Sequence, residues 1–331
     1  MARNKVVMIT GASAGVGRAL VRRFAGPGVS MGLLARGHVG LEAAAQEVRQ
    51  AGGRALAIPT DVSHAEEVEA AADAVERTLG PIDLWINNAM VSVFSPVSEL
   101  KPEEIRHVTE VTYLGTVYGS MAAIKRMLPR NHGMIIQVGS ALAYRGIPLQ
   151  AAYCGAKHAI QGFTESLRCE LLHNHSQVRI TMVQLPAMNT PQFDWVRSRL
   201  PRKPQPVPPI FEPELAAEAI YYAAQHPRRE FYVGGSTVEA IVGNRLIPGL
   251  LDRYLARTGY RSQQTTEPEN PDRADNLWNP VEADKGPHGR FDQQAHRHSL
   301  QVWMSLNARW LGMAAAGLGV AGLCLGPLKR H

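Results

Sequence analysis

Short apolar runs alternate with longer amphipathic segments along roughly the first 240 residues of the chain. The runs are rich in β-branched residues and nearly continuous in hydrophobicity, which is typical of parallel strands buried on both faces. They are KVVMIT (5–10), VSMGLLA (29–35), RALAIP (54–59), DLWIN (83–87), GMIIQVG (133–139), VRITMVQ (178–184) and EFYVG (230–234).

Between these runs, apolar residues recur with the period of a helix. Helices are predicted from about residue 15, over 40–50, over 65–79, from Pro102 to about 128, around 153–157 and after Pro213. Strands that alternate with helices form a parallel sheet covered on both faces. The predicted fold class is therefore α/β, with a doubly wound, Rossmann-like parallel sheet in a three-layer sandwich and a C-terminal extension. Ligands of such sheets bind beyond the carboxyl ends of the strands.

A glycine-rich turn follows the first apolar run. Gly11, Gly15 and Gly17 lie between that run and the helical stretch RALVRRFAG. Glycine permits a sharp turn and lets a pyrophosphate approach the first amides of a helix, where the helix dipole is positive. The spacing is Gly-x-x-x-Gly-x-Gly, whereas the generic dinucleotide fingerprint is Gly-x-Gly-x-x-Gly. We interpret the turn as dinucleotide-binding, the alternative being a glycine-rich turn between any strand and helix.

Tyr153 and Lys157 carry candidate chemistry. Their spacing of four residues places a phenol and an ammonium on one face of a helix, and Ser140 precedes them at the end of an apolar run. A nearby cation lowers the pKa of a phenol and makes it a usable proton donor and acceptor near neutral pH. Taken alone, the spacing also fits an exposed helix that carries one aromatic residue.

Together these motifs resemble the short-chain dehydrogenase/reductase (SDR) family over residues 1 to about 240. The matches are TGASAGVG (10–17), Asp61 after the third run, NNA (87–89) after the fourth, Ser140, and Tyr153 with Lys157. The resemblance implies an oxidoreductase that transfers hydride between a nicotinamide dinucleotide and a carbonyl or secondary alcohol. It implies that Tyr153 exchanges a proton with the substrate oxygen and that Ser140 hydrogen-bonds that oxygen. Lys157 would hold the nicotinamide ribose and lower the tyrosine pKa.

The resemblance also implies a cofactor site at the ends of the predicted strands. Its expected residues are Gly11, Ser13, Gly15, Val16, Gly17, Arg36, Asp61, Val62, Asn88, Ala89, Tyr153, Lys157 and Thr190. Arg36 bears on cofactor choice, because an acid at the end of the second strand would bind the adenosine ribose of NAD(H), whereas a guanidinium binds the 2′-phosphate of NADP(H). We therefore expect NADP(H) in preference to NAD(H), the alternative for Arg36 being an ordinary surface arginine. Arg18 is interpreted as a solvated helix residue.

Three positions depart from the family's pattern. Met90 replaces the usual glycine after NNA, and Ala187 replaces the glycine that usually precedes Thr190. Thr112 stands where the family usually has an asparagine that helps to hold a water chain from the lysine to solvent. Met90 and Thr112 leave a second hypothesis open, namely a redox-inactive nucleotide-binding sensor or scaffold of the same fold.

Composition narrows the range of partners. The formal net charge is +6 without a basic run of five or more residues, so we expect no nucleic-acid partner. The three cysteines and twelve histidines lack metal-ligand spacing, so we expect no metal and interpret the histidines as solvated. Unpaired cysteines fit the reduced thiols of a cytoplasmic protein. The family resemblance implies a homodimer or homotetramer.

The expected substrate is a small-molecule carbonyl or alcohol. An apolar pocket would favour a steroid, a retinoid or a lipid-derived carbonyl, and the same side chains fit plain core or lid packing as an alternative. The candidate lining residues are Met90, Leu142, Ile147, Phe193 and Trp195.

The C-terminal part of the chain changes character after the catalytic domain, which is expected to span residues 1–260. Residues 261–299 are polar and poor in aliphatic clusters, which favours a disordered linker or a surface-wrapping tail. Residues 300–331 form an apolar segment in which the nineteen residues 310–328 carry no charge. That stretch is long enough to attach the protein to the cytoplasmic face of a membrane, the alternative being an oligomer-contacting or core helix.

Overall fold

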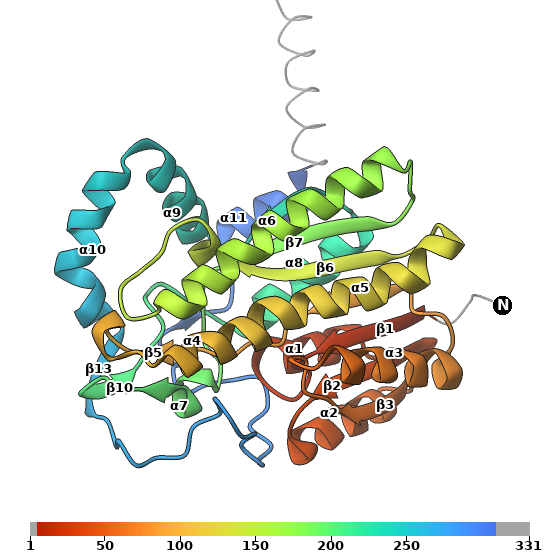
Figure 1. Cartoon of the computed structure of the whole chain (residues 1–331), viewed down its shortest axis with the longest axis horizontal. Coiled ribbons are helices and arrows are strands. Elements are labelled where there is room, and N and C mark those ends of the chain that lie inside the picture. The colour runs from red at the N-terminus through yellow and green to blue at the C-terminus, as the bar shows by residue number, and fades with distance from the viewer. Residues whose placement is uncertain (1–4, 309–331) are drawn as a thin grey trace, which may run out of the picture.

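A computed structural model describes residues 5–308. Within this range the centre of the molecule is a seven-stranded parallel sheet with the order β12-β7-β6-β4-β1-β2-β3 (Figure 1). Its strands are β1 (Lys5–Thr10), β2 (Val29–Ala35), β3 (Arg54–Pro59), β4 (Leu84–Asn87), β6 (Met134–Ser140), β7 (Arg179–Leu185) and β12 (Glu230–Tyr232). The strand order reverses beside β1, which is where α/β sheets of this kind open a ligand crevice. The expected doubly wound sheet is confirmed.

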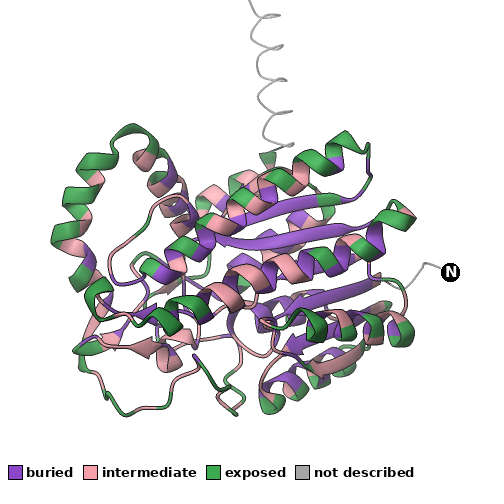
Figure 2. Cartoon of the chain, in the orientation of Figure 1, coloured by how far each residue is buried: buried purple, intermediate pink, exposed green. Residues whose placement is uncertain are grey.

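Helices cover both faces of this sheet. The larger ones are α1 (Gly15–Phe24), α2 (His38–Gln50), α3 (Ala65–Leu79), α4 (Pro102–Val108), α5 (Gly115–Met127), α6 (Ala151–His173) and α8 (Pro213–Gln225). Val7 and Ile9 of β1 pack in one apolar core with α1, α2 and α8, while Val6 and Met8 pack in another with α3, α5 and α6. Figure 2 shows the central strands coloured as buried. Burial on both faces explains why the strands read as continuous apolar runs.

The helix expected from residue 102 to about 128 is interrupted by a wider turn. A π-helical segment, η2 (Thr109–Leu114), lies between α4 and α5. Such segments are often found at functional sites, and this one carries the unusual Thr112.

Additional elements lie over the carboxyl ends of the strands. They are β5 (Val93–Phe94), β8 (Ala187–Met188), α7 (Gln192–Trp195), β9 (Arg197–Ser198), β10 (Arg202–Pro204), β11 (Ile210–Phe211), α9 (Gly235–Leu246) and α10 (Pro248–Ser262). Short 3₁₀ turns occur at Val97–Glu99, Leu128–Arg130 and Ala141–Ala143. Among these elements, β8, α7, α9, α10 and the turn at Ala141–Ala143 supply residues to the cavity described below.

Residues 261–299 do not form the disordered linker that their composition favours; they wrap the surface. β13 (Gln264–Pro268) pairs antiparallel with β10, and β14 (Ala295–His296) pairs parallel with β11. Leu277 and Phe291 are 0% and 4% exposed, so two apolar anchors and backbone pairing hold a segment that is otherwise polar.

The chain then enters α11 (Leu300–Leu306), where Val302 joins the core beside α8. The candidate membrane anchor at 310–328 lies outside the described residues. Among residues 5–308 no helix combines the length and the apolar character needed to cross a membrane.

Candidate active site

A cavity of about 640 Å³ lies at the carboxyl ends of the central strands. Apart from Gly17, every residue expected at the cofactor and catalytic sites lines it. The candidate substrate residues Met90, Leu142, Ile147, Phe193 and Trp195 line it too. The fold therefore brings both groups of predicted residues to one site.

The glycine turn is shaped by backbone that a side chain would obstruct. Gly11 and Gly15 have φ angles of +66° and +56°, which favour glycine. A Cβ on Gly17 would lie 1.9 Å from the carbonyl oxygen of Gly11, so this glycine lets α1 pack closely against the turn. No side chain caps α1 at Ala14, which leaves its first amides to other acceptors.

Asn88 links the glycine turn to the end of β4 through hydrogen bonds. Its side-chain Nδ2 donates to the carbonyl oxygens of Thr10 and Gly11, each at 3.1 Å. In return, Thr10 Oγ1 accepts from the backbone amides of Asn88 and Ala89 at 2.9 and 3.0 Å. Asn88 thus has a structural role besides lining the cavity. The sequence predicted it only as a cofactor-site residue.

Ser140, Tyr153 and Lys157 meet in the cavity from β6 and α6. Ser140 Oγ accepts from the amide of Leu142 at 3.1 Å and is hydrogen-bonded to Tyr153. Lys157 Nζ donates to the carbonyl oxygen of Val138 at 2.7 Å and lies 5.5 Å from the centroid of the Tyr153 ring. The three side chains form one connected group with the end of β6.

The expectation that Lys157 lowers the pKa of Tyr153 is not met in this structure. Burial raises the pKa of the Tyr153 phenol above its ordinary value, and the hydrogen bond with Ser140 only partly opposes this. Burial also lowers the pKa of Lys157 to about 8. The ammonium of Lys157 is directed toward the Val138 carbonyl, and desolvation of the phenol has a larger effect on the pKa of Tyr153 than the charge of that ammonium. The sequence spacing of the two residues does not reveal this. At neutral pH the phenol is therefore a proton donor.

Thr112 is fully buried and pairs with backbone. Its Oγ1 donates to the carbonyl oxygen of Val91 at 3.0 Å and accepts from the Val91 amide at 3.1 Å. Thr112 thus holds the chain that follows NNA, and it is absent from the residues lining the cavity. The two hydrogen bonds of its hydroxyl fix the backbone of Val91 and thereby the position of the neighbouring Met90.

A segment that sequence reasoning missed completes the cavity wall. Residues 276–292, called the strap below, run beside α1 and α2 (Figure 1, blue). The carbonyl oxygen of Gly286 accepts from the amide of Gly15 at 3.0 Å. Four strap residues line the cavity, namely Asn276, Pro280, Val281 and Ala283. The strap therefore forms part of the predicted cofactor site.

Two arginines that face the strap differ from expectation. Arg36 Nη1 donates to the carbonyl oxygens of Leu277 and Trp278 at 3.1 and 3.0 Å, and burial lowers its pKa. Its Nη2 donates to a third carbonyl, that of Asn276. Arg18 is 2% exposed rather than solvated, and it pairs with Glu47 at 2.8 Å and with a strap carboxylate at 3.0 Å.

Asp61 faces the same end of the cavity. Its Oδ1 accepts from the amide and the hydroxyl of Ser63 at 3.0 and 2.7 Å. Burial would raise the pKa of Asp61, but the two hydrogen bonds and the charge of Arg36 hold it below its ordinary value. Asp61 is therefore ionised at neutral pH and partly balances Arg36.

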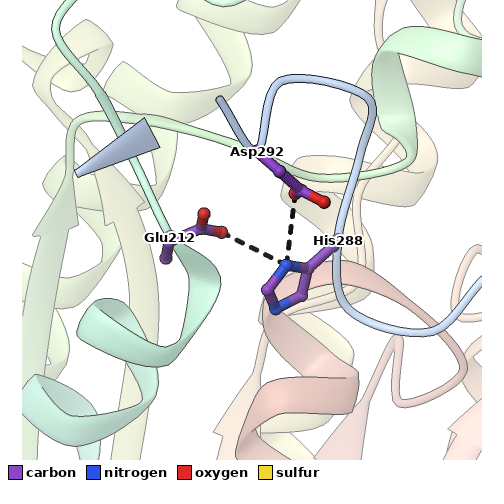
Figure 3. A group of neighbouring side chains, drawn as sticks. All are labelled: Glu212, His288 and Asp292. Carbon is purple, nitrogen blue, oxygen red and sulfur yellow. Dashed lines mark hydrogen bonds and ion pairs between the residues drawn. The ribbon is translucent and has the colours of Figure 1, made fainter. Parts of the chain in front are cut away.

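His288 joins the far end of the strap to the start of α8 (Figure 3). Its Nδ1 lies 3.4 Å from Glu212 and 3.3 Å from Asp292, and its Nε2 lies 2.9 Å from Glu214. Burial opposes protonation, but the hydrogen bond that the imidazole donates to Glu214 and the charges of the other acidic groups raise the pKa of His288. His288 is thus an ion-pair partner of three carboxylates, not the solvated histidine expected. Glu212, His288 and Asp292 have the chemistry to ligate a cation, yet ion pairing already accounts for their arrangement.

Comparison with known proteins assigns the family. Residues 5–200 match the family model described as short chain dehydrogenase. The chain belongs to this family. The short chain dehydrogenases bind NAD(P) and act on CH–OH groups, in agreement with the fold and with the residues that line the cavity.

Individual relatives agree with this assignment. The chain is 32% identical, over 97% of its own length and 89% of the relative's, to "Uncharacterized oxidoreductase YxnA" of Bacillus subtilis. It is 33% identical to "3beta-hydroxysteroid dehydrogenase 1" of Eggerthella lenta, over 75% of this chain and 96% of that protein. Among solved structures, an alcohol dehydrogenase from the archaeon Thermococcus sibiricus, complexed with 5-hydroxy-NADP, is similar with a TM-score of 0.58. That match has 26% identity and covers 69% of this chain and 94% of the archaeal one.

Proposed function

We propose that the protein is a nicotinamide-dependent oxidoreductase that interconverts a carbonyl compound and a secondary alcohol. The observation that carries the proposal is the convergence of Ser140, Tyr153 and Lys157 in one cavity with the glycine turn. A binding module does not need a half-buried phenol that is hydrogen-bonded to a serine and stands beside a buried ammonium.

The glycine turn fits a dinucleotide. A Cβ on Gly11 would lie 2.8 Å from Ala89 Cα, so only backbone can occupy this part of the turn. The turn ends at the start of α1, where the helix dipole favours a pyrophosphate. No side chain caps this helix, although the Gly15 amide donates to the carbonyl of Gly286. The residues that would hold the cofactor are those of the turn, Asp61, Ala89, Lys157 and Thr190. When bound, the nicotinamide supplies or accepts the hydride.

The protein's own contribution is proton transfer and orientation. Tyr153 donates its proton to the oxygen of a carbonyl substrate, because its raised pKa keeps the phenol protonated at neutral pH. Ser140 orients the same oxygen through its hydroxyl. Lys157, held by the Val138 carbonyl, places positive charge next to the phenolate that remains. In the direction of alcohol oxidation the same groups act in reverse, and the rate rises with pH as Tyr153 loses its proton.

We further propose NADP(H) as a cofactor, with NAD(H) as the alternative. Arg36 supports NADP(H), since it lies at the end of β2 where a guanidinium binds a 2′-phosphate. The complex of the archaeal alcohol dehydrogenase with 5-hydroxy-NADP adds support. Because Arg36 already donates to strap carbonyls, a phosphate would have to replace them as acceptor. Cofactor preference therefore depends on the strap.

The substrate proposed is an apolar carbonyl compound or alcohol. Aromatic and aliphatic side chains such as Phe193, Trp195 and Ile147 line the cavity beyond the catalytic group. The name of the Eggerthella lenta relative, a steroid dehydrogenase, points in the same direction. Assembly as a homodimer or homotetramer is a proposal from the family, and a cytoplasmic location is a proposal from the cysteine content.

Turnover of a panel of apolar ketones and secondary alcohols, with both NADPH and NADH, tests the proposal. Tyr153→Phe should lower kcat by about 10²- to 10⁴-fold, the range expected for loss of a general acid, while nucleotide binding persists. The matched control is Tyr260→Phe, which removes the same hydroxyl from a residue that is 49% exposed and outside the cavity. Nucleotide binding without turnover of any substrate by the wild type would favour the sensor or scaffold hypothesis. Equal activity of Tyr153→Phe and wild type would refute the proposed acid.

A further inference from the structure

The end of β2 is where a sheet of this kind distinguishes the two nicotinamide dinucleotides. An acid there accepts from the ribose 2′-hydroxyl of NAD(H), and a cation there holds the 2′-phosphate of NADP(H). In this chain β2 ends at Ala35, Arg36 and Gly37 follow it, and α2 begins at His38. β2 itself supplies no acid at this point, which is why the sequence alone favours NADP(H).

The strap brings an acid to this position. The carboxylate of Glu282 accepts from the backbone amides of His38 and Val39 at 3.3 and 3.2 Å. Its two oxygens lie 3.4 and 3.5 Å from the point where a Cβ on Gly37 would stand, so the carboxylate lies directly against the backbone. No side chain of β2 or α2 caps this helix, and Glu282 caps it from 244 positions further along the chain.

A bound 2′-phosphate would need hydrogen-bond donors that already donate to oxygens of the strap. The guanidinium of Arg36 lines this end of the cavity, and the amides of His38 and Val39 follow directly after Gly37, which also lines it. Strap oxygens already accept from both groups of donors. A phosphate would also be repelled by the negative charge of Glu282, whereas a neutral 2′-hydroxyl can donate to that carboxylate. The strap therefore discriminates against the extra phosphate and not against the remainder of the dinucleotide.

The position of Glu282 does not depend on its own two hydrogen bonds. Asp284 pairs with Arg18, which is buried, and Gly286 accepts from Gly15. Further along, Asn189 donates to Asp292 at 2.6 Å. These contacts keep the strap in place when the side chain at position 282 is changed, so a substitution there tests charge and not folding.

We propose that Glu282 is a specificity-determining residue of the cofactor site. It competes with the 2′-phosphate for the amides of α2, and thereby narrows or reverses the preference for NADP(H) that Arg36 alone would give. This inference rests on the proposed function, because it presupposes that the cavity binds a nicotinamide dinucleotide.

The test compares nucleotide binding by the wild-type chain and by Glu282→Gln. Titration calorimetry with NADPH and NADH gives the ratio of their dissociation constants, and Glu282→Gln should shift that ratio toward NADPH by about tenfold. The matched control is Glu267→Gln, which removes a charge from an exposed residue of the preceding strand β13. It should leave the ratio unchanged.

A second measurement needs no nicotinamide. Adenosine 2′,5′-bisphosphate and 5′-AMP differ only in the 2′-phosphate, so Glu282→Gln should tighten binding of the first about tenfold and leave the second nearly unchanged. An unchanged ratio for both pairs of ligands would refute the role of Glu282 and leave the proposed function intact. If the wild type binds neither dinucleotide, the dinucleotide site is refuted and this inference falls with it.

Discussion

Replacing Gly17 with alanine is a sharp test of the glycine turn. The new Cβ would lie 1.9 Å from the carbonyl oxygen of Gly11 and 2.8 Å from Asn88 Nδ2, so α1 must move away from the turn by about 1 Å or more. Overpacking of this kind costs about 3 kcal/mol, and the better helix propensity of alanine offsets about 1 kcal/mol. We expect a net loss of about 2 kcal/mol in the free energy of unfolding.

Gly162→Ala is the matched control for this prediction. Gly162 lies in α6, and a Cβ there would meet no atom within 4 Å. The same chemical change should therefore stabilise the protein, by up to about 1 kcal/mol. Urea unfolding, read as a shift of the midpoint at constant slope, measures both variants. If Gly17→Ala raises the midpoint as Gly162→Ala does, the close approach of α1 to the turn is refuted.

Two further predictions concern the strap and its surroundings. Arg18→Met should lower the free energy of unfolding by about 3 kcal/mol because it leaves buried acceptors unpaired. Arg22→Met, at an exposed arginine that shares Glu47, should cost less than about 1 kcal/mol in the same urea titration, and equal costs would contradict the role of Arg18. The raised pKa of His288 means that its contribution is fully present below its unfolded pKa of about 6.5 and is lost as pH rises through the higher folded value. The stability advantage of wild type over His288→Gln should therefore fall as pH rises above about 6.5, and a constant difference would contradict ion pairing at Glu212, Glu214 and Asp292.

The sheet and the main site could be predicted because they depend on local patterns. Strands buried on both faces leave continuous apolar runs, as Val6 to Ile9 show. Ser140, Tyr153 and Lys157 are placed by one strand end and one helix face, so their spacing carries the geometry. The glycines of the turn are similarly readable, since positive φ angles and close approach require glycine.

Other features depend on contacts that leave no local pattern. The strap is held in place by hydrogen bonds from Arg36 to its backbone carbonyls and by the burial of Leu277 and Phe291. Backbone carbonyls leave no mark in a sequence, and two apolar residues do not stand out in a polar segment. The raised pKa of Tyr153 follows from desolvation by the assembled cavity, which a spacing of four residues cannot express. Thr112, in the π-helical segment, likewise acts through the backbone of Val91, a partner 21 positions away in the sequence.

The contacts between the strap and α1 also bear on how the chain folds. Arg18 and Asp284 are 266 positions apart, and Gly15 and Gly286 are joined over a similar interval. Contacts of such sequence separation form late, because a long loop must close before they are made. During synthesis, the glycine turn and α1 emerge long before their partners in the strap. The wall of the cavity is thus completed only after the strands of the central sheet and α6 have been made.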